Sequence, residues 1–453
     1  MFIGSCLQGY ANGTFDTLAV ALLLLVAGYV AVSLVFPGSR SELRAFLLTY
    51  GVCLFAGGLA QCYSLAVFHD MQSTTDAFTF FELISPQPPF MTLADMPPFN
   101  SPLAVVAWQQ IYKVTWLLGL EFGPYAAVMF NALVMGLTAS VTVQTARELF
   151  GNDAWRLGRV GTMFAFCGLF ILFGAVMLRD CFVVFLNSVV LLMIVRWLVM
   201  PTIRNVVIAA VLTGVSASAM LFLRVQATML FGVFWFLAFV FWFLAKRLDT
   251  TRAVTGMFAL VTLLIARPYL ESYMRSSREA QGIERESYAE KAASSHSDDS
   301  LGMRLIINQP LPIRLLLGSG SLMVCPIPLW IYFNIHGLDY DWIRGYHGIY
   351  QVLVLPLVFA GGFASFSLFQ SDRKRAVPLL YLVVYLMMGT VAVVATSMEQ
   401  RHLAQFMTSA VILGAVPDTR KKSTREEVVG IAQWWVVVVV IIHLAWAIMK
   451  VRT

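Results

Sequence analysis

Acidic residues that could do chemistry lie between long apolar runs. The first such stretch is 69–103, where Asp76 precedes a group of phenylalanines and a proline-rich turn. In a chain this apolar, carboxylates between apolar runs indicate a functional site. A carboxylate within about 3 Å of a hydroxyl can remove its proton, so we expect Asp76 to act as a general base. The alternative is that Asp76 caps a helix that starts at Ser73-Thr74-Thr75.

A second acidic residue follows in GAVMLRDCFVVF, where Asp180 precedes another apolar run. We expect Asp180 to orient an acceptor or bind a cation, and the alternative is an ion pair with a neighbouring arginine. Basic side chains near such carboxylates could stabilise the charge of a leaving phosphate. Snorkelling to the membrane interface is the alternative for each of them. The basic candidates are Arg179, Arg224, Arg401 and His402, with Lys113 as a weaker one.

Evidence for a metal or cofactor in the sequence is weak. Besides Asp180, the candidate metal ligands are His69 and Asp70, an adjacent nitrogen and oxygen donor. The six cysteines show no CxxC or CxxH spacing, so neither zinc nor haem is predicted. No cofactor is required by the sequence, and a divalent cation, Mg²⁺ or Mn²⁺, remains compatible with it. Nucleotide-binding loops and a nucleophile elbow are also missing, so energy for a reaction must arrive in the substrate.

Composition predicts an all-α polytopic membrane protein of about 12 transmembrane helices. The 453 residues are 59% hydrophobic and 12% charged, whereas soluble domains carry about 25% charged residues. The net charge of +6 is explained by basic loops at the cytoplasmic face, and no nucleic-acid partner is predicted. The predicted spans are roughly 16–36, 45–68, 125–147, 158–178, 182–200, 205–223, 226–245, 253–270, 347–369, 376–396, 403–417 and 429–449.

The distribution of lysine and arginine predicts the topology. The basic short loops fall on one side, which the positive-inside rule makes cytoplasmic, if the segments 103–119 and 314–335 do not cross. In 103–119 the polar residues share one helical face, as in an interfacial helix. Segment 314–335 is interrupted by glycines and prolines, which favours a re-entrant or interfacial element. The basic loops hold Arg40 and Arg44; Arg147, Arg156 and Arg159; Arg196 and Arg204; Lys246, Arg247 and Arg252; Arg373, Lys374 and Arg375; and Arg420, Lys421, Lys422 and Arg425.

This topology divides the chain into five regions. Two outer regions alternate with the membrane segments, and the first of them, with its interfacial helix, is the predicted catalytic loop. The second is polar and serine-rich in part, which suits a lid over a substrate groove or a plain connector. The regions are the first two spans (1–68), the first outer loop (69–124), the transmembrane core (125–270), the second outer region (271–346) and the C-terminal spans (347–453).

Part of the chain resembles a known family. The run 97–151 is similar to the early part of GT-C glycosyltransferases of the protein-mannosyltransferase and lipid-sugar-transferase type, which have an acidic-aromatic motif in the first outer loop. Here that motif is Asp76 with Phe78, Phe80 and Phe81, where relatives often have Asp-Glu followed by Tyr. Two shorter matches are Arg179-Asp180 at the second outer turn and 397–402, SMEQRH, with His402 where Tyr is common.

The resemblance implies a GT-C-like bundle with periplasmic loop helices in a bacterial inner membrane. It also implies an inverting transfer of a sugar from a polyprenyl-(di)phosphate-linked donor to a lipid- or glycan-linked acceptor at the periplasmic face. The partners would be that donor, that acceptor and membrane lipid. Polymerases of O-antigen or exopolysaccharide repeat units are a related alternative. A flippase or transporter of lipid-linked substrates is an alternative of another class, which would place charged residues near the bilayer midplane.

Overall fold

A computed structural model describes residues 1–69, 75–95, 101–244, 306, 309–324, 341–396 and 399–452. Within these residues the chain is helical and contains no strand. Eight of the described helices are long and apolar enough to cross a membrane. The prediction of an all-α polytopic membrane protein is therefore confirmed. The predicted span 253–270 and most of the second outer region lie outside the described residues.

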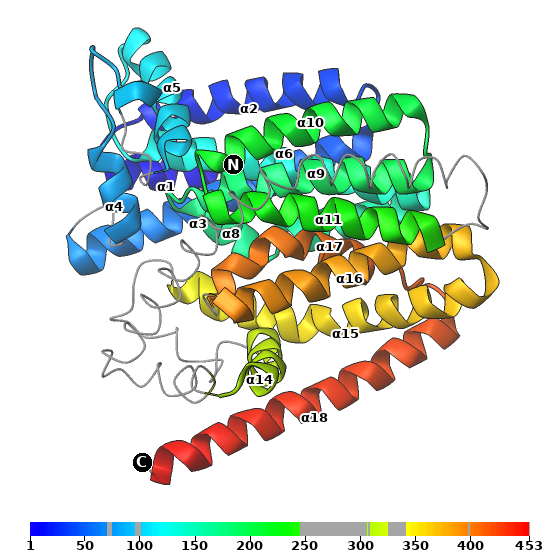
Figure 1. Ribbon diagram of the computed structural model, residues 1–453. Helices are drawn as coiled ribbons and strands as arrows, with labels where there is room; N and C mark the ends of the chain where they lie inside the picture. The colour runs from blue at the N-terminus through cyan, green and yellow to red at the C-terminus, as the bar shows by residue number, and fades with distance from the viewer. Residues whose placement is uncertain are drawn as a thin grey trace.

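The eight long helices run side by side along one direction, except that the last one slants away from the bundle (Figure 1). Their lengths fit the roughly 20 residues that a hydrocarbon core of about 30 Å requires. They are α2 (Asp16–Val35), α3 (Arg40–Phe68), α6 (Tyr125–Phe150), α9 (Asp180–Val199), α10 (Ile203–Leu221), α15 (Asp341–Ser371), α16 (Arg373–Thr396) and α18 (Lys422–Arg452).

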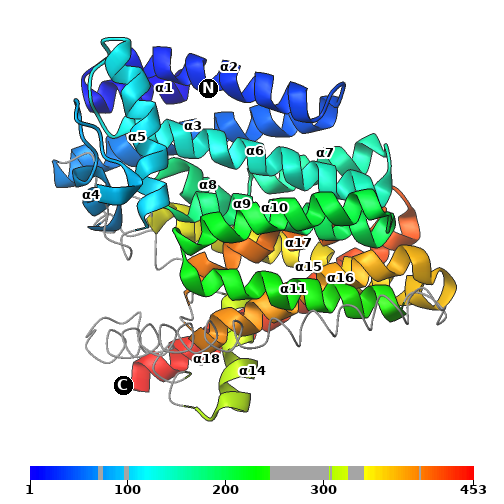
Figure 2. The ribbon, with the colours of Figure 1, turned by 45° about the horizontal axis from the view of Figure 1, so that its top comes forward.

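Two predicted spans take other forms, and a third is present as one continuous apolar helix. The span predicted at 158–178 is a broken pair, α7 (Ala154–Ala165) and α8 (Gly168–Ala175), with a bend of 56°. The span at 403–417 is a 3₁₀ turn, η2 (Gln400–Leu403), followed by α17 (Ala404–Gly414). All eleven residues of α17 are buried. The span at 226–245 is α11 (Val225–Leu244), which lies beside the long helices (Figure 2).

Helix α6 forms the centre of the N-terminal half. Small residues on α6 and its neighbours let these helices approach closely, as is usual in membrane proteins. The ring of Phe46 on α3 occupies the space above Gly28 of α2 and Gly136 of α6, where an added Cβ would lie 2.1 Å and 2.7 Å from ring atoms of Phe46. Phe46 is fully buried there. This contact joins three of the spanning helices.

The break between α7 and α8 leaves backbone carbonyls without helical partners. Two tyrosines of α15 satisfy them: the Tyr350 hydroxyl donates to the Met163 carbonyl oxygen at 2.7 Å, and the Tyr346 hydroxyl donates to that of Phe166 at 2.9 Å. An unsatisfied carbonyl at this depth would be costly, because no water is available inside a bilayer. The tyrosines therefore hold the broken helix in its bent form.

The basic loops that the structure describes lie together at one end of the bundle, and the loop with Lys246, Arg247 and Arg252 lies outside the described residues. Ion pairs join the ends of elements there: Arg147 to Glu42 at 2.6 Å, Arg196 to Glu148 at 2.6 Å, and Arg420 to Asp153 at 3.4 Å. Figure 1 shows the turn between α15 and α16 at the same end. The gathering of basic loops that the sequence predicts is thus present in the fold.

The opposite end carries the short helices. There, α4 (Thr75–Glu82), the 3₁₀ turn η1 (Leu93–Asp95) and α5 (Pro102–Leu117) form a cap over the bundle. Helix α5 and, nearer the C-terminal helices, α14 (Leu311–Val324) run across the bundle (Figure 2), which agrees with the prediction that 103–119 and the described part of 314–335 do not span. A further short helix, α1 (Phe2–Asn12), was not predicted and packs along the second half of α3.

Candidate active site

The structure brings six of the predicted site residues to the end of the bundle that carries α4 and α5. Each lies where a helix begins. Asp76 is in the first turn of α4, and Asp180 is the first residue of α9 with Arg179 as its N-cap. Arg224 directly precedes α11, and Arg401 with His402 forms η2 ahead of α17. Residues from four distant parts of the sequence therefore meet.

The buried part of the cluster centres on Arg224. Its Nη1 lies 3.6 Å from Oδ1 of Asp180, and its Nη2 lies 2.8 Å from Nε2 of His402. Only 11% of the Arg224 and Asp180 side chains is exposed. A buried charge pair of this kind costs much to break, because removing one partner leaves the other charge without compensation. Asp180 is therefore placed to hold Arg224.

The exposed part of the cluster centres on Arg401. Its Nη1 lies 3.0 Å from Oδ2 of Asp76, and its Nε forms an ion pair with the carboxylate of Glu399. That carboxylate also lies 3.7 Å from Nε2 of His402, which links the two parts. The Asp76 side chain is 54% exposed, so a substrate can reach it.

Arg179 joins the cluster to the cap. Its Nη1 donates a hydrogen bond to Oγ of Ser101, the N-cap of α5, and Ser101 donates to the carbonyl oxygen of Leu223 at 3.1 Å. Burial lowers the pKa of Arg179, and the charges of Arg224 and Arg401 act in the same direction, whereas Asp180 and Asp76 oppose them. Arginine nevertheless stays protonated in proteins, so Arg179 is a partly buried cation near both carboxylates.

His402 is uncharged in this setting. Burial lowers the pKa of His402 well below its usual range, and the charges of Arg224, Arg401 and Arg179 lower it further. A guanidinium can only donate hydrogen bonds, so the 2.8 Å contact with Arg224 requires Nε2 of His402 to be the acceptor. The ring proton then lies on Nδ1.

The charges and helix ends make the cluster suitable for an anion. The first backbone N–H groups of a helix have no helical partners, and the helix dipole favours negative charge near them. The starts of α5, α9, α11 and η2 meet here together with three arginines. Three carboxylates balance those arginines, so an incoming phosphate would compete for guanidinium groups that carboxylates now hold.

The loops that carry these residues are fixed by buried polar contacts. The Asn131 amide donates to the carbonyl oxygens of Val176 and Leu178, at 2.9 and 3.2 Å, just ahead of Arg179. Its Oδ1 accepts from Nε1 of Trp108 at 2.7 Å. One side chain of α6 thereby fixes both the turn before α9 and the cap helix α5.

Aromatic contacts fix α4. Phe80 packs on Trp108 with ring centres 5.3 Å apart, and Phe81 packs on Phe122 at 5.0 Å. Phe78 is exposed instead. Two phenylalanines of the predicted acidic-aromatic motif thus anchor the helix on which Asp76 lies, which explains their position in structural terms.

Other predicted site residues lie apart from the cluster. Lys113, on α5, contacts Gln110 at 3.3 Å, and its Nζ lies 5.6 Å from the centre of the Phe90 ring. His69 is exposed and ends α3, and Asp70 lies outside the described residues. Across the described part of the chain, no group of three or more His, Cys, Asp or Glu side chains could hold a metal ion.

Two cluster members were not among the predicted site residues. The sequence comparison included Glu399 only within the SMEQRH match and did not give it a role. Its position two residues before Arg401 could have indicated that the two side chains pair. Nothing in the sequence pointed to a contact of Ser101 with the site residues, because its contact with Arg179 depends on the packing of α5 against the turn before α11.

Comparison with known proteins adds no assignment. No protein-family model matches the sequence, and no curated protein matches it.

Proposed function

We propose that this protein is an integral membrane glycosyltransferase that uses a polyprenyl-(di)phosphate-linked sugar as donor. The acceptor would be a lipid- or glycan-linked hydroxyl, and the reaction would take place at the periplasmic face of a bacterial inner membrane. The observation that carries the proposal is the exposed Asp76 held by Arg401 near the partly buried cations Arg179 and Arg224. Such a transfer needs a base and a stabiliser of the leaving phosphate in one place.

The ion pair of Asp76 with Arg401 suggests how binding prepares the base. Nη1 of Arg401 and Oδ2 of Asp76 are 3.0 Å apart. A donor phosphate that bound Arg401 would draw the guanidinium away and leave an Asp76 oxygen free. This oxygen would then accept the proton of the acceptor hydroxyl as that hydroxyl attacks the anomeric carbon. The bond between the sugar and the phosphate breaks, the configuration inverts, and the phosphate leaves with the carrier.

The buried residues have a supporting role in this proposal. Arg179 and Arg224 would stabilise the charge that develops on the leaving phosphate. Asp180 would position Arg224, because the Asp180 carboxylate is largely enclosed and already forms an ion pair with this arginine. A Mg²⁺ or Mn²⁺ ion, where used, would be held largely by phosphate oxygens, which is a common arrangement for Mg²⁺ at phosphate substrates.

The decisive experiment is sugar transfer by the purified protein in lipid, with a panel of polyprenyl-linked sugars. We expect transfer by the unmodified protein and a loss of about 100-fold or more in Asp76→Asn, because a positioned general base contributes that much. Asp95→Asn is the matched control, since Asp95 is an exposed carboxylate of the same loop whose partner among the described residues is Thr92. It should keep full activity.

The same assay separates the alternatives. A ladder of products would identify a polymerase of repeat units, whereas a single transfer supports the proposed transferase. Full activity of Asp76→Asn would show that Asp76 is not the base. If no donor were consumed and labelled lipid crossed the bilayer, the protein would be a flippase and the proposal would be wrong.

A further inference from the structure

A groove on the side of the bundle lies away from the candidate active site, toward the end with the basic loops. It is a cavity of about 520 Å³ lined by residues of α2, α6, α9 and α10. Helices α2 and α10 are among the most exposed of the spanning helices, with 28% and 17% of their apolar windows buried inside the protein. In a membrane, surfaces of this kind face lipid, so the groove is open to the bilayer.

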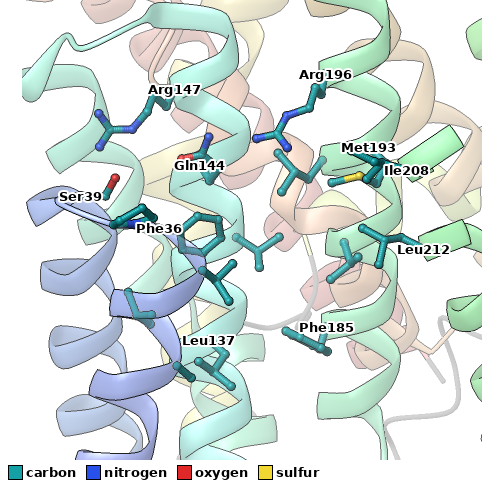
Figure 3. Close-up of a pocket in the computed structure, with 17 residues that line it drawn as sticks. Phe36, Ser39, Leu137, Gln144, Arg147, Phe185, Met193, Arg196, Ile208 and Leu212 are labelled. Carbon is teal, nitrogen blue, oxygen red and sulfur yellow. The ribbon is translucent and has the colours of Figure 1, made fainter. Parts of the chain in front are cut away.

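The lining changes from polar to apolar along the groove (Figure 3). Arg147, Arg196, Gln144 and Ser39 line one end, and Leu137 and Phe185 lie at the other. On α6 the ten residues between 137 and 147 span about 15 Å. The groove therefore has the polarity of an amphiphile with one charged end.

Each arginine at the polar end pairs with a glutamate that lies outside the groove. Arg147 pairs through Nε and Nη2 with Glu42, and Arg196 pairs through the same two nitrogens with Glu148. Neither glutamate lines the groove. Nη1 of Arg196 makes no hydrogen bond to any described residue. Two oriented guanidinium groups thus border the groove, and Nη1 of Arg196 can donate a hydrogen bond to a ligand.

We propose that this groove binds an anionic phospholipid from the membrane leaflet at the basic end. The headgroup phosphate lies between Arg147 and Arg196, and one acyl chain fills the apolar part. The site is independent of the glycosyltransferase proposal. A volume of about 520 Å³ over a length of about 15 Å gives the groove a mean width close to that of one hydrocarbon chain. That width is too small for a helix, which has a diameter of about 10–12 Å. Arginine is also the side chain best suited to phosphate.

Native mass spectrometry of the purified full chain tests this proposal, with phosphatidylglycerol and phosphatidylcholine of identical acyl chains as probes. Both lipids carry the phosphate, but phosphatidylcholine adds a choline cation that the two arginines repel and that makes the headgroup neutral overall. We therefore expect phosphatidylglycerol to bind about tenfold more tightly, which corresponds to about 1.4 kcal/mol. Leu212→Trp fills the groove and should remove this difference. Its control is Val211→Trp, at the same depth of α10, where the side chain is 59% exposed and does not line the groove.

A second pair of variants tests the charge. Arg196→Gln should also remove the preference, whereas Arg375→Gln should keep it, because Arg375 is an ion-paired arginine of the same end that lies away from the groove. Should Arg196→Gln fail to fold, Leu212→Trp decides alone. Equal binding of the two lipids, or unchanged selectivity in Leu212→Trp, would overturn the proposal. Should the unmodified chain prove to be a dimer that Leu212→Trp separates without a change in bound lipid, the proposal would be overturned as well and the groove would be assigned to a second copy of the chain.

Discussion

At the scale of single residues, the candidate site depends on arginines that carboxylates already hold. Asp180 holds Arg224 in the buried part, and Asp76 and Glu399 hold Arg401 in the exposed part. This pairing keeps Arg224 and Arg401 close together, near Arg179. It also means that binding and chemistry are coupled, since a phosphate has to replace a carboxylate.

The uncharged state of His402 predicts a pH dependence of stability. Its pKa in the folded protein is well below the ordinary value, so below about pH 6.5 the unfolded chain binds a proton that the folded chain does not. Stability is therefore lost as the pH falls through that value, by about 1.4 kcal/mol at pH 5.5. Thermal unfolding in lipid at pH 7.5 and 5.5 should show this loss, and His402→Gln should reduce it. A protein that became more stable at pH 5.5 would show instead that Glu399 holds a charged His402.

The sequence alone was informative about individual residues and less so about their contacts. Charges are rare in this chain, so Arg179, Asp180, Arg224 and Arg401 stand out at the ends of apolar runs. Their meeting point depends on how distant helices pack, which hydropathy does not contain. For the same reason the sequence did not predict the role of Ser101, and it placed Lys113 with residues that it does not contact.

At the scale of elements, the bent pair α7 and α8 shows what a hydropathy pattern misses. Both halves are apolar, so 158–178 has the pattern of one continuous span. The bend is stabilised by hydroxyl groups from α15, which lies almost two hundred residues away. Helix α1 was missed because it is only eleven residues long.

The tyrosine contacts at this break predict a stability difference between two matched variants. Tyr350→Phe removes the buried hydroxyl that satisfies the Met163 carbonyl oxygen and should lower the free energy of unfolding by about 1–3 kcal/mol. Tyr346→Phe should cost less, because its contact with Phe166 is more exposed. Thermal unfolding of both variants in the same lipid provides the comparison. Equal stability of Tyr350→Phe and the unmodified protein would contradict this role.

At the scale of the whole molecule, the two ends of the bundle differ in kind. One end carries the basic loops and the ion pairs that join them, and the other carries the short helices and the candidate site. By the positive-inside rule we expect the basic end to face the cytoplasm. The prediction of this asymmetry needed only the sequence, because it depends on counting charges between apolar runs.

Labelling with a membrane-impermeant thiol reagent tests this orientation. Thr92 and Ser423 are exposed at opposite ends of the bundle. A cysteine at position 92 should react in intact spheroplasts, and one at 423 should react only after the membrane is opened. The unmodified chain provides the background of its native cysteines. Reaction at 423 in intact spheroplasts would place the basic end outside and would remove the proposed periplasmic site.

The enclosure of α17 has a consequence for how the protein is made. Its eleven residues extend about 16 Å, roughly half of the hydrocarbon thickness, and none of them faces lipid. Such a segment is too short to span a membrane by itself, so it must pack against helices that are already inserted. Arg401 and His402 lie directly ahead of α17. We therefore expect the chain to remain inactive during most of its synthesis and to complete its candidate site only when the C-terminal helices have been inserted.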